Sequence, residues 1–186
     1  MNDAGDPQRA RELLDALEVY QPARQAFLGT LRLPASNRDP LAEFSEQLVC
    51  ALLAGSLAAS RVQPGHDLTL SDDRRVQVRY LANPGGTWVN EHLVHRIPGV
   101  HLYALVIFEA FAVVGVLVFP TDGLAPICTA LGKQHPHQQE QLQFTRRNWH
   151  TIRDDPTRFE NLGMRVWLPP YTGPPSRGTG LLHHRT

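Results

Sequence analysis

The sequence predicts an α/β fold in which a mixed central sheet is flanked by helices, with an extra helical segment at the N-terminus. Three observations predict it: helical spacing of apolar residues in the first third, short apolar strands in the middle, and a helical segment followed by a strand near the end. The chain has 186 residues and is 42% hydrophobic, which is enough for one sizeable core. We expect a helical extension over 1–38, one domain over 39–169 and a flexible tail over 170–186.

The composition limits the partners, metal sites and cellular compartment that we expect for this protein. Eighteen basic and eighteen acidic side chains cancel, so any surface for nucleic acid must be local. Cys50 and Cys128 lie in apolar stretches, which indicates buried thiols in a reducing compartment, and the nine histidines lack the spacing of a closed zinc site. The N-terminus lacks the features of a signal peptide, and no apolar run is long enough to span a bilayer. These features predict a cytoplasmic protein without membrane association.

The first elements are helical. Residues 7–32 have helical spacing, and Pro22 predicts a break into two short helices. A clearer helix follows, with Asp39 as its N-cap and Gly55 as its end. Its apolar stripe consists of Leu41, Phe44, Leu48, Val49, Leu52 and Leu53. Glu43 and Glu46, one turn apart, share a face near the edge of that stripe.

A hairpin with a charged turn is predicted next. Paired residues of an antiparallel hairpin share a face, so the apolar positions of its two strands fix the register. A three-residue loop over 72–74 pairs Leu70 with Val76 and Leu68 with Val78. This register packs apolar side chains on one face and leaves the other face polar.

The polar face of the hairpin gathers three side chains. Gln77 and Arg79 point the same way from the second strand because side chains alternate along a strand. The predicted register places Asp67 opposite Arg79, with Gln77 diagonal to it. Asp67 and Arg79 are therefore expected either to form part of a functional centre or to make a cross-strand ion pair on a half-exposed sheet.

The rest of the chain alternates strands and helices. The stretch "LYALVIFEA" is almost continuously apolar, as expected for a central strand covered on both faces. A Gly/Pro-punctuated connection with a short strand precedes it, and the following segments are read in order as strand "VVGVLVFP", helix "LAPICTALG", strand "LQFT", helix "RRNWHTIRDDPTRFENLG" and strand "MRVWL".

A helix with a glutamate, a strand with an aspartate and a neighbouring strand with Gln-x-basic form a recognisable order. In Glu46, Asp67, Gln77 and Arg79 the chain resembles the PD-(D/E)XK nuclease-like superfamily, and its Gln resembles the Mrr-type restriction endonuclease branch. The resemblance covers residues 39–120, or as far as residue 168, and implies a restriction-endonuclease-like core. It implies that Glu46 (or Glu43), Asp67 and Gln77 are ligands of Mg²⁺ or Mn²⁺, and that Arg79 occupies the position of the lysine that contacts the scissile phosphate.

Two functions remain open on this resemblance. In the first, Glu46, Asp67, Gln77 and Arg79 form the catalytic centre of a Mg²⁺-dependent endodeoxyribonuclease that hydrolyses phosphodiester bonds. In the second, the nuclease fold is catalytically inactive and binds DNA or a protein partner. Arg79 and Gln77 separate them. Arginine stays protonated and cannot act as a general base, although it stabilises transition-state charge, and Gln77 offers a metal ion only an uncharged oxygen. Either protein is compatible with a homodimer or a partner subunit.

A basic segment is the best candidate for a local nucleic-acid-binding face. Arg146, Arg147 and Arg153 cluster there with Trp149, and such a combination contacts phosphates and stacks on bases. Acidic residues in the same segment dilute the charge. A solvated amphipathic helix is the alternative interpretation.

Overall fold

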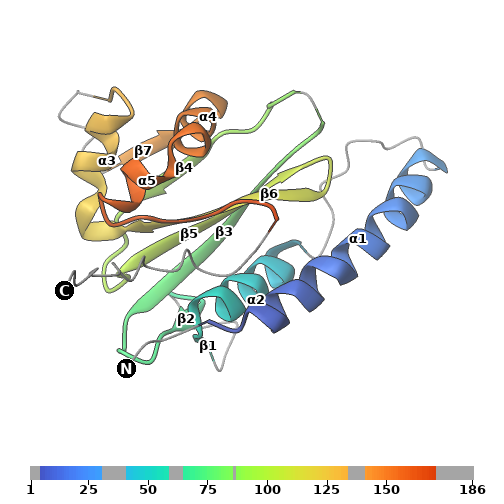
Figure 1. Ribbon diagram of the computed structural model, residues 1–186, viewed down its shortest axis with the longest axis horizontal. Coiled ribbons are helices and arrows are strands. Elements are labelled where there is room, and N and C mark those ends of the chain that lie inside the picture. Colours follow the sequence, from blue (N-terminus) through green and yellow to red (C-terminus); the bar gives the residue numbers. More distant parts are fainter. Residues whose placement is uncertain (1–4, 31–40, 59–64, 86, 134–140, 171–186) are drawn as a thin grey trace, which may run out of the picture.

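The computed structural model describes residues 5–30, 41–58, 65–85, 87–133 and 141–170. Over these ranges the protein is α/β, with a six-stranded mixed sheet and a smaller two-stranded sheet (Figure 1). The predicted tail lies outside the described residues except for its first residue, Pro170. The elements in chain order are α1 (Pro7–Thr30), α2 (Leu41–Leu53), β1 (Ser56–Leu57), β2 (Leu68–Thr69), β3 (Arg75–Asn83), β4 (His92–His95), β5 (Leu102–Glu109), β6 (Ala112–Pro120), η1 (Thr121–Gly123), α3 (Leu124–Ala130), β7 (Gln141–Phe144), α4 (Arg146–Asp154), α5 (Pro156–Glu160) and β8 (Arg165–Trp167).

The large sheet has the order β1-β2-β3-β5-β6-β8. Its β3–β5 pair is parallel and its other pairs are antiparallel, so the predicted mixed sheet is confirmed. The strand expected to be central is β5, which is buried from Leu102 to Phe108 because both of its faces are covered. The smaller sheet pairs β4 with β7.

Two apolar clusters cover the two faces of the large sheet. One contains residues of α1 and α2 together with Val76 and Val78 of β3. The other contains residues of β4, β7, α3, α4 and α5 together with Leu105 and Ile107 of β5. Figure 1 shows the same arrangement, with α1 and α2 on one side of the sheet and the remaining helices on the other. The predicted helices on both faces are therefore confirmed.

The expected break at Pro22 is wrong, because α1 runs as a single helix with Pro22 inside it. Contacts on both sides of the proline hold the helix against the β5–β6 turn. Gln21 donates from Nε2 to the carbonyl of Ala110 at 2.7 Å, and the guanidinium of Arg24 lies 3.2 Å from the centre of the Phe111 ring. These tertiary contacts offset the hydrogen bond that a proline removes from the helix.

The second helix ends one residue earlier than expected. Leu53 is the last helical residue, and Ala54 takes the left-handed conformation with a φ of 52°. Gly55 then donates its N–H to the carbonyl of Cys50 at 3.0 Å, which is the long hydrogen bond of a Schellman C-cap. The predicted N-cap, Asp39, lies outside the described residues.

The two cysteines are free thiols, as expected. Cys128 is buried in the second apolar cluster, and Cys50 is half-buried in α2. Burial raises the pKa of both thiols. Among the helices of the described ranges, none is long and apolar enough to cross a bilayer.

Candidate functional site

The hairpin of β2 and β3 has the predicted parity but a different register. Leu68 pairs with Val76, and Leu70 donates its N–H to the carbonyl of Arg74 at 2.9 Å. The loop is three residues long, as expected, and it lies one position earlier because Asp73 adopts a left-handed φ of 63°. Aspartate tolerates this conformation, which closes a three-residue hairpin loop. The predicted register is therefore wrong by two positions on the partner strand.

A shift of two positions keeps every side chain on its predicted face. Asp67 now lies opposite Gln77, and Arg79 is diagonal to it. The Oδ2 atom of Asp67 accepts a hydrogen bond from Nε2 of Gln77 and lies 3.6 Å from Nη1 of Arg79. The structure thus brings Asp67, Gln77 and Arg79 together.

These side chains also terminate the edge of β3. The short strand β2 ends opposite the first residues of β3, so the next outward-facing peptide group, at Val78, needs other partners. Asp67 accepts from the N–H of Val78 at 2.7 Å, and Arg79 donates from Nη1 to the carbonyl of Val78 at 2.8 Å. The Asp67–Arg79 pair therefore satisfies the peptide groups of Val78 at the edge of β3, and we call this pair the structural cap.

The structure places Glu46 on a different element and over a different face of the sheet from Gln77 and Arg79. α2 packs with Val76 and Val78 on one face of the sheet, whereas Gln77 and Arg79 leave β3 on the other face. Glu46 is half-buried on α2, so it belongs to the helix over the opposite face. The side chain of Glu43 lies outside what the structure describes. The expected grouping of a glutamate with Gln77 and Arg79 on one face is not seen for Glu46.

Two histidines and a tyrosine lie next to Arg79. Tyr103 is the register partner of Gln77 in β5, and its hydroxyl lies 2.7 Å from Nε2 of His92. The His95 ring lies 6.0 Å from the Tyr103 ring, and the Tyr103 hydroxyl also donates to the carbonyl of Leu93 at 3.4 Å. Sequence reasoning missed this cluster, although the His-x-x-His spacing at the end of a polar connection was a signal that could have found it.

The surroundings of His92 and Tyr103 keep both side chains neutral near pH 7. Burial, together with the charges of Arg79 and His95, lowers the pKa of His92 to about 4. Burial also raises the pKa of Tyr103 to about 12, with Asp67 adding to the rise and Arg79 opposing it. The site therefore contains one fixed cation, Arg79, beside groups that can donate and accept hydrogen bonds.

The low pKa of His92 predicts a loss of stability in acid. The unfolded chain binds a proton near the ordinary histidine pKa of 6.5, whereas the folded protein resists protonation until about 4. The stability that depends on neutral His92 is therefore full above pH 6.5 and falls as the pH decreases toward 4. In His92→Gln, the free energy of unfolding is expected to vary less over this window than in the wild type, as urea titrations at a series of pH values would measure. Parallel curves for the two proteins would contradict this expectation.

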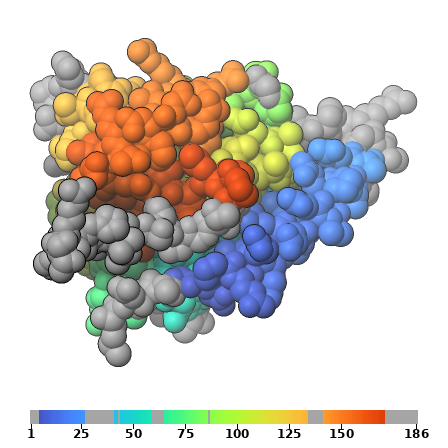
Figure 2. Space-filling view, in the orientation of Figure 1, coloured from blue at the N-terminus to red at the C-terminus, as the bar shows by residue number. Residues whose placement is uncertain are grey.

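The second predicted surface is formed by α4. Arg146, Arg147 and Arg153 are exposed there, and Arg153 pairs with Asp154 at 3.0 Å. In Figure 2 the α4–α5 segment, in orange, forms a continuous part of the visible surface. The capping box between Thr145 and Asn148, in which each side chain bonds the other's backbone, fixes the start of the helix.

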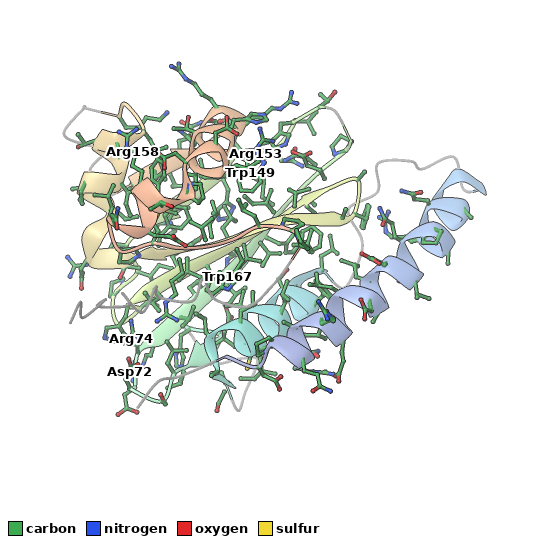
Figure 3. All side chains as sticks on the ribbon, in the orientation of Figure 1. Asp72, Arg74, Trp149, Arg153, Arg158 and Trp167 are labelled. Atoms are coloured by element: carbon green, nitrogen blue, oxygen red, sulfur yellow. The ribbon has the colours of Figure 1, made fainter. Side chains whose placement is uncertain are left out.

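The expectation for Trp149 is wrong. Its side chain is only 1% exposed and packs in the second apolar cluster, so it is not available to stack on a base. Figure 3 shows Trp149 lying under α4, with Arg153 nearby and the Asp72–Arg74 turn at the far end of the view. The basic face of α4 thus consists of arginines alone, which contact phosphates without stacking.

No protein-family model matches this chain, and a search of curated proteins finds no match. The interpretation of the Asp67–Gln77–Arg79 cluster therefore depends on its geometry and on the resemblance described above.

The cluster does not fit a Mg²⁺ ion in the arrangement seen. Mg²⁺ takes oxygen ligands, with one or two carboxylates plus substrate phosphates. Here Asp67 is the only carboxylate among the three residues, and its Oδ2 atom already faces the amide of Gln77, the N–H of Val78 and the cation of Arg79. Gln77 also turns its NH₂ group toward Asp67, whereas a metal would need its oxygen. Within the described parts of the chain, no group of three or more His, Cys, Asp or Glu side chains is arranged to hold a metal.

Proposed function

We propose that this protein has a restriction-endonuclease-like core and binds the phosphate groups of DNA. It does not hydrolyse DNA by a Mg²⁺-dependent route. The order of the elements supports the proposal. Helix α2 is followed by the β2–β3 hairpin, which contains Asp67 and, in β3, Gln77 and Arg79, and the buried strand β5 pairs parallel to β3. This is the order on which the resemblance to nuclease-like proteins depends.

The observation that carries the proposal is that the guanidinium of Arg79 is half-exposed and already held in one orientation. Its side chain is 51% exposed, yet its Nη1 atom is held by the carbonyl of Val78 and by Asp67. A half-exposed guanidinium that is already oriented loses little conformational entropy when it binds a phosphate oxygen. The arginines of α4 supply further exposed cations on the protein surface.

Two features argue against hydrolysis at this centre. Arg79 stays protonated and cannot remove a proton from an attacking water. The Oδ2 atom of Asp67 accepts the N–H of Val78 at the edge of β3, so this carboxylate already has a structural partner where a nuclease would use it to bind a metal ion. The cluster is therefore better suited to binding than to catalysis.

The second candidate is the Mg²⁺-dependent endodeoxyribonuclease, and the placement of Asp67 and Gln77 on one face of the hairpin favours it. These are the two side chains that the resemblance assigns to the metal on the hairpin. The enzyme would require the Gln77 amide to turn its oxygen outward. It would also require a further carboxylate, from α2 or from a partner chain.

A plasmid-nicking assay separates the two candidates. We expect that wild-type protein, Arg79→Lys and Asp67→Ala all leave supercoiled plasmid uncut in Mg²⁺ or Mn²⁺, while wild-type protein retards the same DNA in a gel. Arg79→Ala should retard it more weakly, because one phosphate contact is lost. Nicking by the wild type that disappears in Asp67→Ala would overturn the proposal and establish the nuclease. Nicking that persists in Asp67→Ala would indicate a contaminant, and the preparation would be purified and tested again.

A further inference from the structure

Four side chains from three strands form one cluster, in which Tyr103 contacts both histidines and the charge of Arg79 acts on Tyr103 and His92. Arg79 comes from β3, His92 and His95 from β4, and Tyr103 from β5. The rings of His92 and His95 lie 5.8 Å and 6.0 Å from the Tyr103 ring. The charge of Arg79 is felt by both His92 and Tyr103. The cluster therefore combines a fixed cation with two imidazoles.

The guanidinium of Arg79 uses one of its nitrogens for its contacts within the hairpin. Within the described residues, its hydrogen bond to Val78 and its ion pair with Asp67 are both made by Nη1. The N–H groups of Nε and Nη2 form the fork that recognises two oxygens of one phosphate. Contacts at Nη1 thus orient the side chain and leave that fork for an anion.

The hydrogen bonds of the histidines fix where their protons lie. The carbonyl of Leu93 can only accept, so Nδ1 of His95, 3.3 Å away, carries a proton and Nε2 is its second site. The Tyr103 hydroxyl is 2.7 Å from Nε2 of His92 and 3.4 Å from the Leu93 carbonyl, so its stronger hydrogen bond is to His92. The hydroxyl has one proton, which it donates either to the Leu93 carbonyl or to Nε2 of His92. In the second case Nδ1 of His92 carries the ring proton and is a donor.

We propose that Arg79, His92 and His95 form a binding site for one phosphate group of a nucleic acid, with Tyr103 as the residue that positions His92. The proposal rests on the proposed function and names the chemistry that its central arginine recognises. Arg79 supplies charge and the fork, and the imidazoles supply further donors. Tyr103 is buried and acts through His92 rather than on the ligand.

The charge balance of the cluster suits an anion that needs no metal ion. Asp67 is the nearby carboxylate, and its Oδ2 atom is taken up by Gln77, Val78 and Arg79.

Nitrogen-15 NMR of the histidine side chains tests the site directly, with inorganic phosphate and with a short double-stranded DNA oligonucleotide as separate probes. In the wild type we expect both probes to shift the ring nitrogens of His92 and His95 in a saturable way. Arg79→Gln should weaken phosphate binding by about tenfold or more, the scale for losing one charged hydrogen-bond donor. Tyr103→Phe should change the tautomer signal of His92 before any ligand is added. Arg74→Gln is the matched control, because Arg74 pairs with Asp72 at the turn of the same hairpin and should bind phosphate like the wild type.

The outcomes separate this inference from the proposed function. If the oligonucleotide binds but neither probe shifts His92 or His95, the phosphate site is wrong and DNA binding stands. If phosphate shifts both histidines and the oligonucleotide does not bind, the site is right and DNA is not its ligand. Equal phosphate affinity in the wild type and Arg79→Gln would overturn the role of Arg79. If Arg79→Gln does not fold, Arg79→Lys keeps the charge, lacks the fork, and should show an intermediate loss of affinity.

Discussion

Replacing Gly115 with valine is expected to destabilise the protein by about 3 kcal/mol, the upper part of the range for overpacking a core. Gly115 lies in β6 directly under the indole of Trp149. A Cβ atom there would lie 2.8 Å from Cζ3 and 3.3 Å from Cζ2 of that ring, and closer still to Cη2. Since Trp149 is only 1% exposed and surrounded by other apolar side chains, it has little room to move. Urea unfolding of the variant would measure the effect as a shift of the midpoint.

A valine at Ala112 is the matched control for this substitution. Ala112 lies in the same strand as Gly115 and is exposed, so the larger side chain meets no core. We expect its unfolding midpoint to stay close to that of the wild type. If Gly115→Val and Ala112→Val were equally stable, the packing of α4 on β6 described here would be incorrect.

Removing the carboxylate of Asp67 is expected to cost about 2 kcal/mol or more, because it leaves buried donors without an acceptor. The N–H of Val78 and the amide of Gln77 both donate to Asp67, and Gln77 is only 4% exposed. Asp67→Asn retains an acceptor oxygen and should be milder than Asp67→Ala. Chemical denaturation of both variants measures the difference.

The sign of the Asp67 effect also bears on function. Carboxylates in catalytic centres are often held against the preference of the fold, so their removal tends to be neutral or stabilising. Unchanged or increased stability in Asp67→Ala would therefore contradict the structural cap and favour the metal-binding interpretation. A clear loss of stability supports the cap.

The face of each hairpin side chain could be predicted from sequence, whereas the register could not. Alternation of side chains and an odd loop length decide which residues share a face, and these follow from the apolar positions of the two strands. The position of the loop depends on which residue adopts the left-handed conformation. Asp73 and its neighbours offer several choices, so the register moved by two positions without exchanging faces.

Other expectations were wrong or untested because tertiary contacts decide them. The helical spacing of α2 predicted a buried stripe, but it carries no information on which face of the sheet the helix covers, so the side on which Glu46 lies was not predictable. From the sequence, Trp149 is compatible with a surface residue that stacks on bases and with a core residue. Its burial depends on Gly115, which makes room for the indole and lies in a strand distant in sequence. Pro22 is retained within α1 by contacts with residues about 90 positions later in the chain, such as the Gln21–Ala110 bond with a separation of 89.

The cluster of His92, His95 and Tyr103 could not be predicted either, because tertiary contacts bring these residues together. His92 and His95 follow an irregular connection whose path is not encoded by any periodic pattern, and Tyr103 lies in an apolar strand where its hydroxyl gives no signal. The parallel pairing of β3 with β5 sets Tyr103 beside Gln77. The contact between β4 and that position then depends on the packing of the two-stranded sheet over the larger one.

The central claim, metal-independent binding of DNA phosphates at Arg79, is tested most directly by fluorescence anisotropy of a labelled DNA duplex in EDTA and in Mg²⁺. The account predicts that wild-type protein binds with similar affinity in both buffers at matched ionic strength. Arg79→Gln should bind more weakly and reduce the slope of log affinity against log salt by about one. Arg74→Gln, whose arginine pairs with Asp72 at the hairpin turn, should behave like the wild type. Binding that requires Mg²⁺, or that is unaffected by Arg79→Gln, would contradict the account.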